Sequence, residues 1–93
     1  MRQSRSALRQ AVFLRAVGAA IRFRREQLNL TIVQVAGRLG TSPAAVARLE
    51  RGARNVTLLQ LEAIAGALEV PLAALLSFAE RRAGNRRRSR HEG

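Results

Sequence analysis

The 93-residue chain contains no cysteine, no aspartate and no lysine, and it has a single histidine and only three aromatic residues, all phenylalanine. Without cysteine it can form neither a disulfide framework nor a cysteine-ligated zinc site. Without aspartate it cannot build an aspartate-dependent catalytic triad or an EF-hand, and one histidine cannot make a two-histidine metal site. We therefore expect no enzyme active site, no metal and no cofactor.

Long apolar stretches are missing as well. The uncharged run from Val70 to Ala79 is ten residues long, whereas a membrane-spanning helix needs about 20 apolar residues. Hydrophobic residues nevertheless make up 47% of the chain, which is enough for the core of one small domain. We expect one domain and no membrane partner.

Arginine is the abundant residue, because it supplies all seventeen basic side chains and a net charge of +11. The charge lies at the two ends: residues 1–25 carry +7, residues 26–80 carry −1 and residues 81–93 carry +5. A near-neutral middle with two basic ends indicates a polyanionic partner, and nucleic acid is the first candidate. The alternative is a solvated surface in a GC-rich proteome.

The hydrophobic pattern predicts five helices and no strand. Leu14, Val17 and Ile21 fall on one face of an amphipathic helix expected over residues 7–28. Four shorter helices are expected after it, over 32–39, 43–51, 58–68 and 71–80. Their start signals are a capping box at Thr31, an N-cap at Ser42 followed by proline, a second capping box at Thr57, and Pro71.

The ends of the chain are expected to differ from its middle. Residues 1–16 are interpreted as an N-terminal extension continuous with the first helix, and residues 17–80 as the domain itself. Residues 81–93 contain no apolar residue except Ala83, so we expect them to form a disordered arginine-rich tail.

The segment from Ile32 to Arg51 has the pattern of a helix-turn-helix. Two short helices are joined by a tight turn that begins at Gly40, a residue that can take the positive φ angle of a sharp turn. Ala36 is small enough for the second helix to cross closely. Apolar residues stand where the two helices meet the body of the domain: Val35, Val46 and Leu49. An ordinary αα-hairpin is the alternative.

With its flanks, this segment resembles the Cro/CI-type (Xre) helix-turn-helix family over residues 17–77. The matching motifs are Gly18-x-x-Ile21-Arg22, Arg25-Glu26, Leu30-Thr31, Val35-Ala36, Leu39-Gly40-Thr41-Ser42, Val46, Leu49-Glu50-Arg51-Gly52, Arg54-Asn55, Thr57-Leu58, Ile64-Ala65-x-x-Leu68, and Val70 followed by Leu75-Leu76. The resemblance implies an all-α, compact five-helix DNA-binding domain, often dimeric on an inverted repeat, in the cytoplasm of a bacterium or encoded by a phage. The run from Glu50 to Thr57 is also similar to the restriction–modification controller branch.

The resemblance implies that the helix from Ser42 to Arg51 reads DNA. Its candidate base-reading residues are Ala44, Ala47 and Arg48, and Arg48 is the strongest because arginine donating to guanine is the commonest specific contact. The residues that the resemblance places at phosphates are Thr31, Ile32, Gln34, Thr41, Ser42, Pro43, Arg51, Arg54 and Asn55. Such contacts set the register of the protein on DNA rather than its sequence preference.

The chain departs from the family at two places. The family usually has glutamine at the position of Ile32, and it usually has polar residues at Pro43 and Ala44. Gln34 is the candidate replacement for the missing glutamine. These departures weaken direct base readout and favour a contribution from DNA shape.

Two further sets of residues carry structural roles by resemblance. Arg25 and Glu50 are expected to form a partly buried ion pair that holds the recognition helix, with two separate surface charges as the alternative. The dimer interface is expected on the last helix, with Phe13 and Phe23 of the first helix as a second contributor. Its candidate residues are Leu72, Leu75, Leu76 and Phe78.

The sequence therefore predicts a transcriptional regulator, a repressor or autoregulator, that binds double-stranded DNA as a homodimer. One alternative is an antitoxin-type module, which binds a protein partner such as a toxin or another regulator as well as its own operator. The other is a non-specific architectural nucleic-acid binder.

Overall fold

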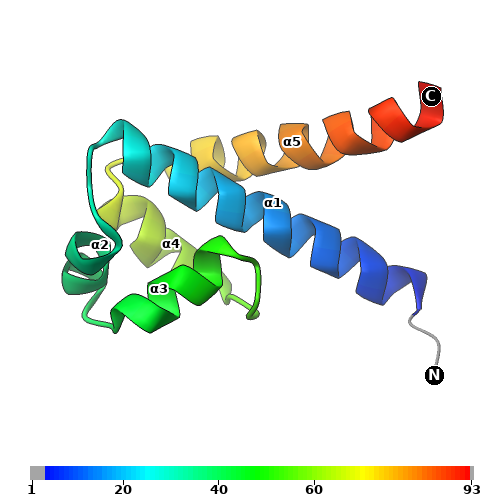
Figure 1. Cartoon of the computed structure of the whole chain (residues 1–93). Coiled ribbons are helices and arrows are strands. Elements are labelled where there is room, and N and C mark those ends of the chain that lie inside the picture. The colour runs from blue at the N-terminus through cyan, green and yellow to red at the C-terminus, as the bar shows by residue number, and fades with distance from the viewer. Residues whose placement is uncertain (1–3, 93) are drawn as a thin grey trace.

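The computed structural model describes residues 4–92, with side chains described as far as Gly84, and it is built from helices alone over this range (Figure 1). The five helices are α1 (Arg5–Gln27), α2 (Ile32–Leu39), α3 (Pro43–Glu50), α4 (Leu58–Ala67) and α5 (Leu72–Glu92). The expected all-α, five-helix architecture is confirmed, and the first four helices begin and end within two residues of their expected bounds.

The long helix α1 packs against α5 and α3, while α2 packs against α3 and α4. The side chain of Ser4 caps its start by accepting a hydrogen bond from the Ala7 N–H at 3.1 Å. The helix then runs without a break through the expected N-terminal extension into the domain. Its buried side is made of small and β-branched residues, which let α5 and α3 approach closely: Ala16, Val17, Gly18, Ala20 and Ile21.

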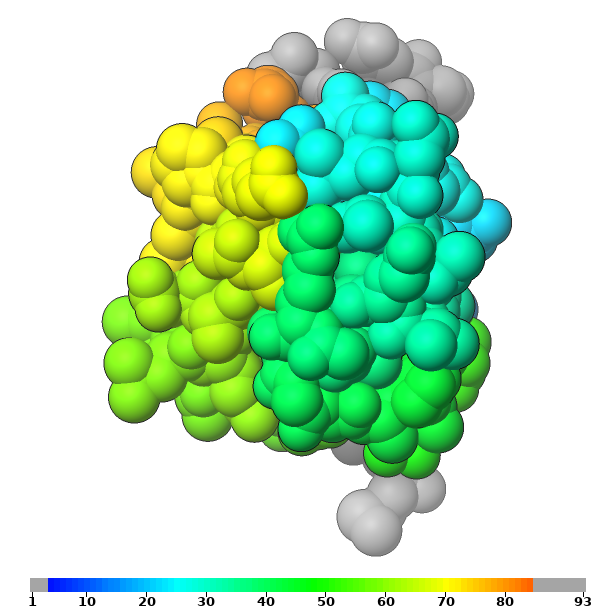
Figure 2. Space-filling model, turned by 90° about the vertical axis from the view of Figure 1, so that its left-hand side faces the viewer, coloured from blue at the N-terminus to red at the C-terminus, as the bar shows by residue number. Residues whose placement is uncertain are grey.

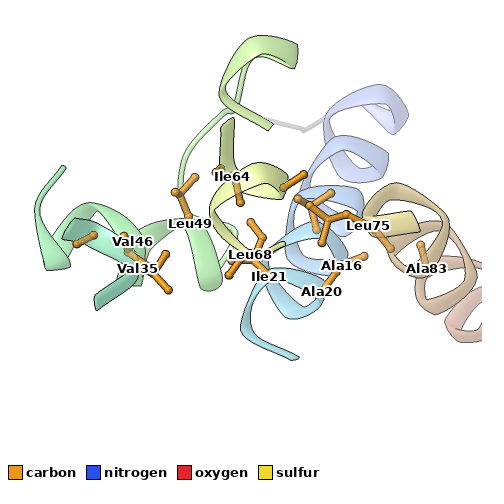
Figure 3. Close-up of a cluster of buried hydrophobic side chains, with 14 residues drawn as sticks. Ala16, Ala20, Ile21, Val35, Val46, Leu49, Ile64, Leu68, Leu75 and Ala83 are labelled. Atoms are coloured by element: carbon orange, nitrogen blue, oxygen red, sulfur yellow. The ribbon is translucent and has the colours of Figure 1, made fainter. Parts of the chain in front are cut away.

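One hydrophobic core joins all five helices (Figure 3). Its largest fully buried side chains come from four different helices or their caps: Ile21, Val35, Val46 and Leu68. Burial of one such side chain stabilises the fold by about 1.5–3 kcal/mol. Val35 of α2 and Val46 of α3 therefore fix how the two helices of the motif sit on the rest of the domain.

Two glycines allow the backbone of α1 to contact the backbone at the end of α3 directly. A Cβ atom at Gly18 would overlap the carbonyl oxygens of Leu49 and Glu50. A Cβ atom at Gly52 would come within 2.7 Å of the backbone nitrogen of Arg15, and Gly52 also has a φ angle of +69°. Glycine is thus required at both positions, and the C-terminal end of α3 is held directly against α1.

The C-terminal boundary differs from the expected one. α5 continues beyond Glu80, and Ala83 is buried in the core at 4% exposure. Because arginine is a good helix former, Arg81 and Arg82 do not end the helix. The folded body therefore reaches Gly84, and the placement of residues 81–84 in a disordered tail is corrected. The backbone of residues 85–92 continues as α5 where a disordered tail was expected, and the side chains from residue 85 onward lie outside the described residues.

Among the described residues, no single helix is long and apolar enough to cross a membrane. Only α4 together with the Leu72–Gly84 part of α5 reaches that length and composition, and these two segments meet at an angle of 105°.

Candidate nucleic-acid interface

The first helix of the motif, α2, begins at a capping box. Thr31 Oγ1 accepts a hydrogen bond from the Gln34 N–H at 3.1 Å, and Gln34 Oε1 accepts one from the Thr31 N–H at 2.8 Å. The N–H groups of Ile32 and Val33 have no partner among residues 4–84. These two amides are available to an anion at the start of α2.

Gln34 is more restricted than its sequence position indicates. Its side-chain oxygen accepts a hydrogen bond from the Thr31 N–H, which fixes the orientation of its NH2 group, the donor that a phosphate requires. Ile32 is half-buried and has no polar side chain. The anion site at the start of α2 therefore depends on backbone amides more than on side chains.

The turn between the two helices has the conformation that its glycine allows. Gly40 takes a left-handed φ angle of 67° and ends α2. Ser42 caps α3, because its Oγ accepts a hydrogen bond from the Ala45 N–H at 3.1 Å. Thr41 is exposed and its side chain has no hydrogen-bond partner within the described range. Both hydroxyls are therefore able to donate to a phosphate.

The recognition helix α3 has one buried face and one face turned to solvent. The inward side is buried in the core through Ala45, Val46 and Leu49. On the other side Ala44 and Arg48 are exposed and Ala47 is half-buried. The Arg48 guanidinium has no ion-pair or hydrogen-bond partner among residues 4–84, so it is free to reach a base edge.

The segment after α3 carries the remaining candidate phosphate contacts. Arg51 and Asn55 are exposed, whereas Arg54 is half-buried. Arg54 lines an open pocket of about 170 Å³ together with Thr41 from the α2–α3 turn. Two candidate phosphate-binding residues, thirteen positions apart in the sequence, thus meet at one hollow. Figure 2 shows the face of the molecule on which α2 and the α2–α3 turn lie beside α4.

An ion pair joins the end of α1 to the end of α3. Arg25 Nε donates to Glu50 Oε2 at 2.6 Å and Arg25 Nη2 donates to Glu50 Oε1 at 3.1 Å. The two side chains are 12% and 7% exposed, so they are not two separate surface charges. The hydrogen bond to Glu50 raises the pKa of Arg25 above its usual value, against burial, which lowers it. Arg25 Nη1 also donates to the Leu30 carbonyl at 2.9 Å, so one guanidinium holds both the entry to α2 and the end of α3.

Two more arginines stabilise the motif, and no sequence motif singled them out. Arg24 donates to the carbonyls of Leu68 and Glu69 at 2.9 and 2.8 Å. Arg38, near the end of α2, donates to the Ala67 carbonyl at 2.8 Å and to the Glu69 carboxylate at 2.9 Å. Basic side chains are favourable at the carbonyls that end a helix. Arg24 therefore ties the end of α4 to α1, and Arg38 ties it to α2.

The expected dimer surface on α5 needs one correction. Leu75 is 3% exposed within its own chain, because it points into the core, so it offers no surface to a partner. Leu72, Leu76 and Phe78 are half-buried. The Phe78 ring stacks on Phe23 with a centroid distance of 5.0 Å, so these two aromatic residues cover each other in part.

Comparison with known proteins agrees with this geometry. A family model described as helix-turn-helix matches residues 21–75, which is more than half of the chain and includes all of α2, α3 and α4. No curated protein matches the chain.

Several solved structures are similar to it, and three of them are described here. Two are crystal structures of the clp gene regulator ClgR from Corynebacterium glutamicum. The first is 31% identical, covers 73% of this chain and 87% of that chain, and has a TM-score of 0.71. The second is 26% identical, covers 85% of this chain and 84% of that chain, and has a TM-score of 0.81. The third is the restriction-modification controller protein C.AhdI from Aeromonas hydrophila, which is 31% identical, covers 67% of this chain and 94% of that chain, and has a TM-score of 0.64.

Proposed function

We propose that this chain, which belongs to the Xre-type helix-turn-helix family, binds an inverted-repeat operator as a homodimer and acts there as a repressor or autoregulator. Its family makes it a DNA-binding transcriptional regulator and not an enzyme. The described residues form one domain with one core, and this domain regulates by occupying DNA. That role belongs in the cytoplasm, where the DNA of a bacterium or phage lies.

The observation that carries the proposal is the position of Arg48. It is exposed on α3, and α3 is held to α1 by the Arg25–Glu50 ion pair. A rigid helix with one unengaged arginine on its outer face is suited to donate two hydrogen bonds to a guanine in the major groove.

Phosphate contacts surround this position. The amides at the start of α2 and the hydroxyls of Thr41 and Ser42 come before α3 in the chain, and Arg51, Arg54 and Asn55 come directly after it. Contacts of this kind set the register of α3 on the duplex, and the alanines on its outer face leave part of the specificity to DNA shape.

The test is an unbiased selection of bound sites from random DNA, followed by affinity measurements at one fixed salt concentration. We expect a palindromic site with half-sites about 10 base pairs apart. We also expect the selected site to bind about 10³-fold or more tightly than scrambled DNA. A ratio near unity would instead identify an architectural nucleic-acid binder.

The remaining alternative is distinguished by a protein partner. A stable complex with a toxin encoded beside the gene, formed by the same chain that binds the selected site, would identify an antitoxin-type module. Repression of a reporter by the chain alone, through the selected site, supports the proposed regulator.

A further inference from the structure

The pocket that Thr41 and Arg54 share has a third polar residue in its lining, Gln60 of α4. We call this pocket of about 170 Å³ the α3–α4 hollow, and its other lining residues are apolar ones from α2, α3 and α4. The three polar side chains come from three segments: the α2–α3 turn, the segment after α3 and the first turn of α4. All three can donate hydrogen bonds, and none of the lining residues is an acid. The hollow therefore offers donors to an anion and no carboxylate that would repel it.

Two of these donors are not used within the described part of the chain. The Thr41 hydroxyl and the Arg54 guanidinium form no side-chain hydrogen bond or ion pair to residues 4–84. The Thr57 hydroxyl differs from them, because its Oγ1 accepts a hydrogen bond from the Gln60 N–H at 3.1 Å. Since Thr41 is exposed and Arg54 is half-buried, both can turn to an anion from outside the chain.

The third donor, Gln60, has a structural role that uses its side-chain oxygen alone. Gln60 Oε1 accepts a hydrogen bond from the Thr57 N–H at 2.8 Å and so closes the capping box of α4. This bond fixes the orientation of the NH2 group, and Gln60 is exposed. A glutamate would close the same box and would interact more favourably with the positive end of the helix dipole. Glutamine differs from glutamate in carrying a donor, which is the group that an anion requires.

The α3–α4 hollow flanks the exposed face of the recognition helix. It is lined by Ala45 and Leu49, which follow Ala44 and Arg48 of that face by one position and therefore by about 100° around α3. With its side chains a helix is about 10–12 Å wide, and the major groove of DNA is about 12 Å wide. When the exposed face of α3 points at the bases, its flanks lie at the edges of the groove, where the phosphates are.

We propose that Gln60 is a further DNA-binding residue, which binds one backbone phosphate at the α3–α4 hollow together with Thr41 and Arg54. This inference rests on the DNA binding proposed above. The Gln60 NH2 group, the Thr41 hydroxyl and the Arg54 guanidinium donate to oxygens of the same phosphate, and hydrogen bonds to a charged acceptor are the strong ones. As a backbone contact, this phosphate sets the position of the domain on the duplex and carries no sequence preference of its own.

The substitution Gln60→Glu tests the proposal while it preserves the capping box. A glutamate still accepts the hydrogen bond from the Thr57 N–H, so we expect a melting temperature equal to or above that of the wild type. It has no NH2 donor, and it places a negative charge beside the phosphate. We therefore expect the full chain to bind the selected site and scrambled DNA about tenfold more weakly or worse, to the same extent on both.

Gln10→Glu is the matched control, because it makes the same change of charge at an exposed residue of α1 outside the hollow. We expect it to weaken DNA binding much less than Gln60→Glu. Equal affinities of these two variants would show that Gln60 only closes its capping box. Arg54→Gln combined with Gln60→Glu should weaken binding by less than the product of the two single effects, since both residues contact one phosphate. Independent effects contradict the shared contact.

Ethylation of individual phosphates on the selected site locates the contact. We expect one ethylated phosphate in each half-site to weaken binding of the wild type and to have no further effect on Gln60→Glu or on Arg54→Gln. Different phosphates for the two variants, or the wild-type pattern in Gln60→Glu, overturn the proposal. If the wild type binds none of these DNAs, the proposed function fails and this inference fails with it. Wild-type binding with equal affinities of Gln60→Glu and Gln10→Glu removes the role of Gln60 alone.

Discussion

Gly18 of α1 lies directly against the carbonyl of Glu50, the last residue of α3, with no side chain between the two helices. The Arg25–Glu50 ion pair joins the same two helices through side chains only two turns further along α1. The end of the recognition helix is therefore fixed by a steric contact and by a charged one, and these can be tested separately.

Replacement of Gly18 by alanine tests the steric contact. The added methyl group would overlap the Leu49 and Glu50 carbonyls, so α1 and α3 must separate. We expect a loss of about 1–3 kcal/mol in the free energy of unfolding, measured by denaturant titration, and weaker DNA binding. Gly66→Ala is the matched control, because Gly66 lies in a helix with open space around it and alanine there is expected to gain up to about 1 kcal/mol. Equal effects of the two substitutions would contradict the close approach.

Replacement of Glu50 by alanine tests the ion pair. It leaves the Arg25 guanidinium, which is 12% exposed, without its carboxylate partner, and the loss of one member of a buried pair costs about 3–5 kcal/mol. We expect the melting temperature to fall by more than ~10 °C in a domain of this size. Glu26→Ala breaks the exposed pair with Arg22, whose side chain is 64% exposed, and a longer contact of 4.0 Å with Arg25, while the Arg25–Glu50 pair stays intact; it should cost about 0.5 kcal/mol or less. Similar melting temperatures for both variants would refute the role given to Glu50.

Arg48→Ala is expected to reduce sequence preference more than general affinity. If Arg48 donates two hydrogen bonds to a guanine, its removal costs about 1–3 kcal/mol on the selected site and little on scrambled DNA. Arg51→Ala provides the comparison, since a lost phosphate contact weakens both DNAs alike. Gel-shift titrations on the two DNAs measure this difference. Equal losses in Arg48→Ala would make Arg48 a phosphate contact.

The homodimer is testable by sedimentation at micromolar concentration, with and without the selected DNA. We expect a dimer, and we expect Leu76→Asp to shift it toward monomer because a carboxylate is costly in an apolar interface. Leu75 is unsuitable for this test, because its burial within the chain makes any polar substitution there unfold the monomer. A wild-type monomer under both conditions would rule out the dimer.

The arginine-rich C-terminus is expected to add phosphate contacts without sequence preference. Deletion of residues 85–93 removes four arginines and keeps the buried Ala83. If each arginine engages one phosphate, the slope of log affinity against log salt should flatten by roughly 3–4 units, at about 0.9 per phosphate. The preference for the selected site should stay the same. An unchanged slope would show that this segment serves another purpose than DNA binding.

Local signals were sufficient to locate most of the helices. The capping boxes at Thr31 and Thr57 and the N-cap at Ser42 each lie within four residues of the groups they bind, and all three are formed. The apolar pattern of α2 and α3 likewise indicated which residues, among them Val35 and Val46, enter the core.

Interactions between residues far apart in the sequence were harder to predict. Arg24 and Arg38 bind carbonyls 29 to 45 positions away, and among seventeen arginines no spacing rule identifies them. The length of α5 was underestimated for a similar reason, since Ala83 is buried only because α1 extends far enough to cover it. The inward direction of Leu75, rather than Leu72 or Leu76, follows from the angle between α4 and α5, which the helical period of α5 alone does not set.

The packing of α1 on α5 has a consequence for synthesis on the ribosome. α1 cannot complete its packing until α5 has been synthesised, because α5 covers its apolar side and no helix between them takes that place. During translation α1 therefore exposes Ala16, Ala20 and Phe13 to chaperones and to other nascent chains until α5 has left the exit tunnel. A chain that ends before α5 lacks Leu75, Ala79 and Ala83 of the core, so we expect its helix-turn-helix to be destabilised.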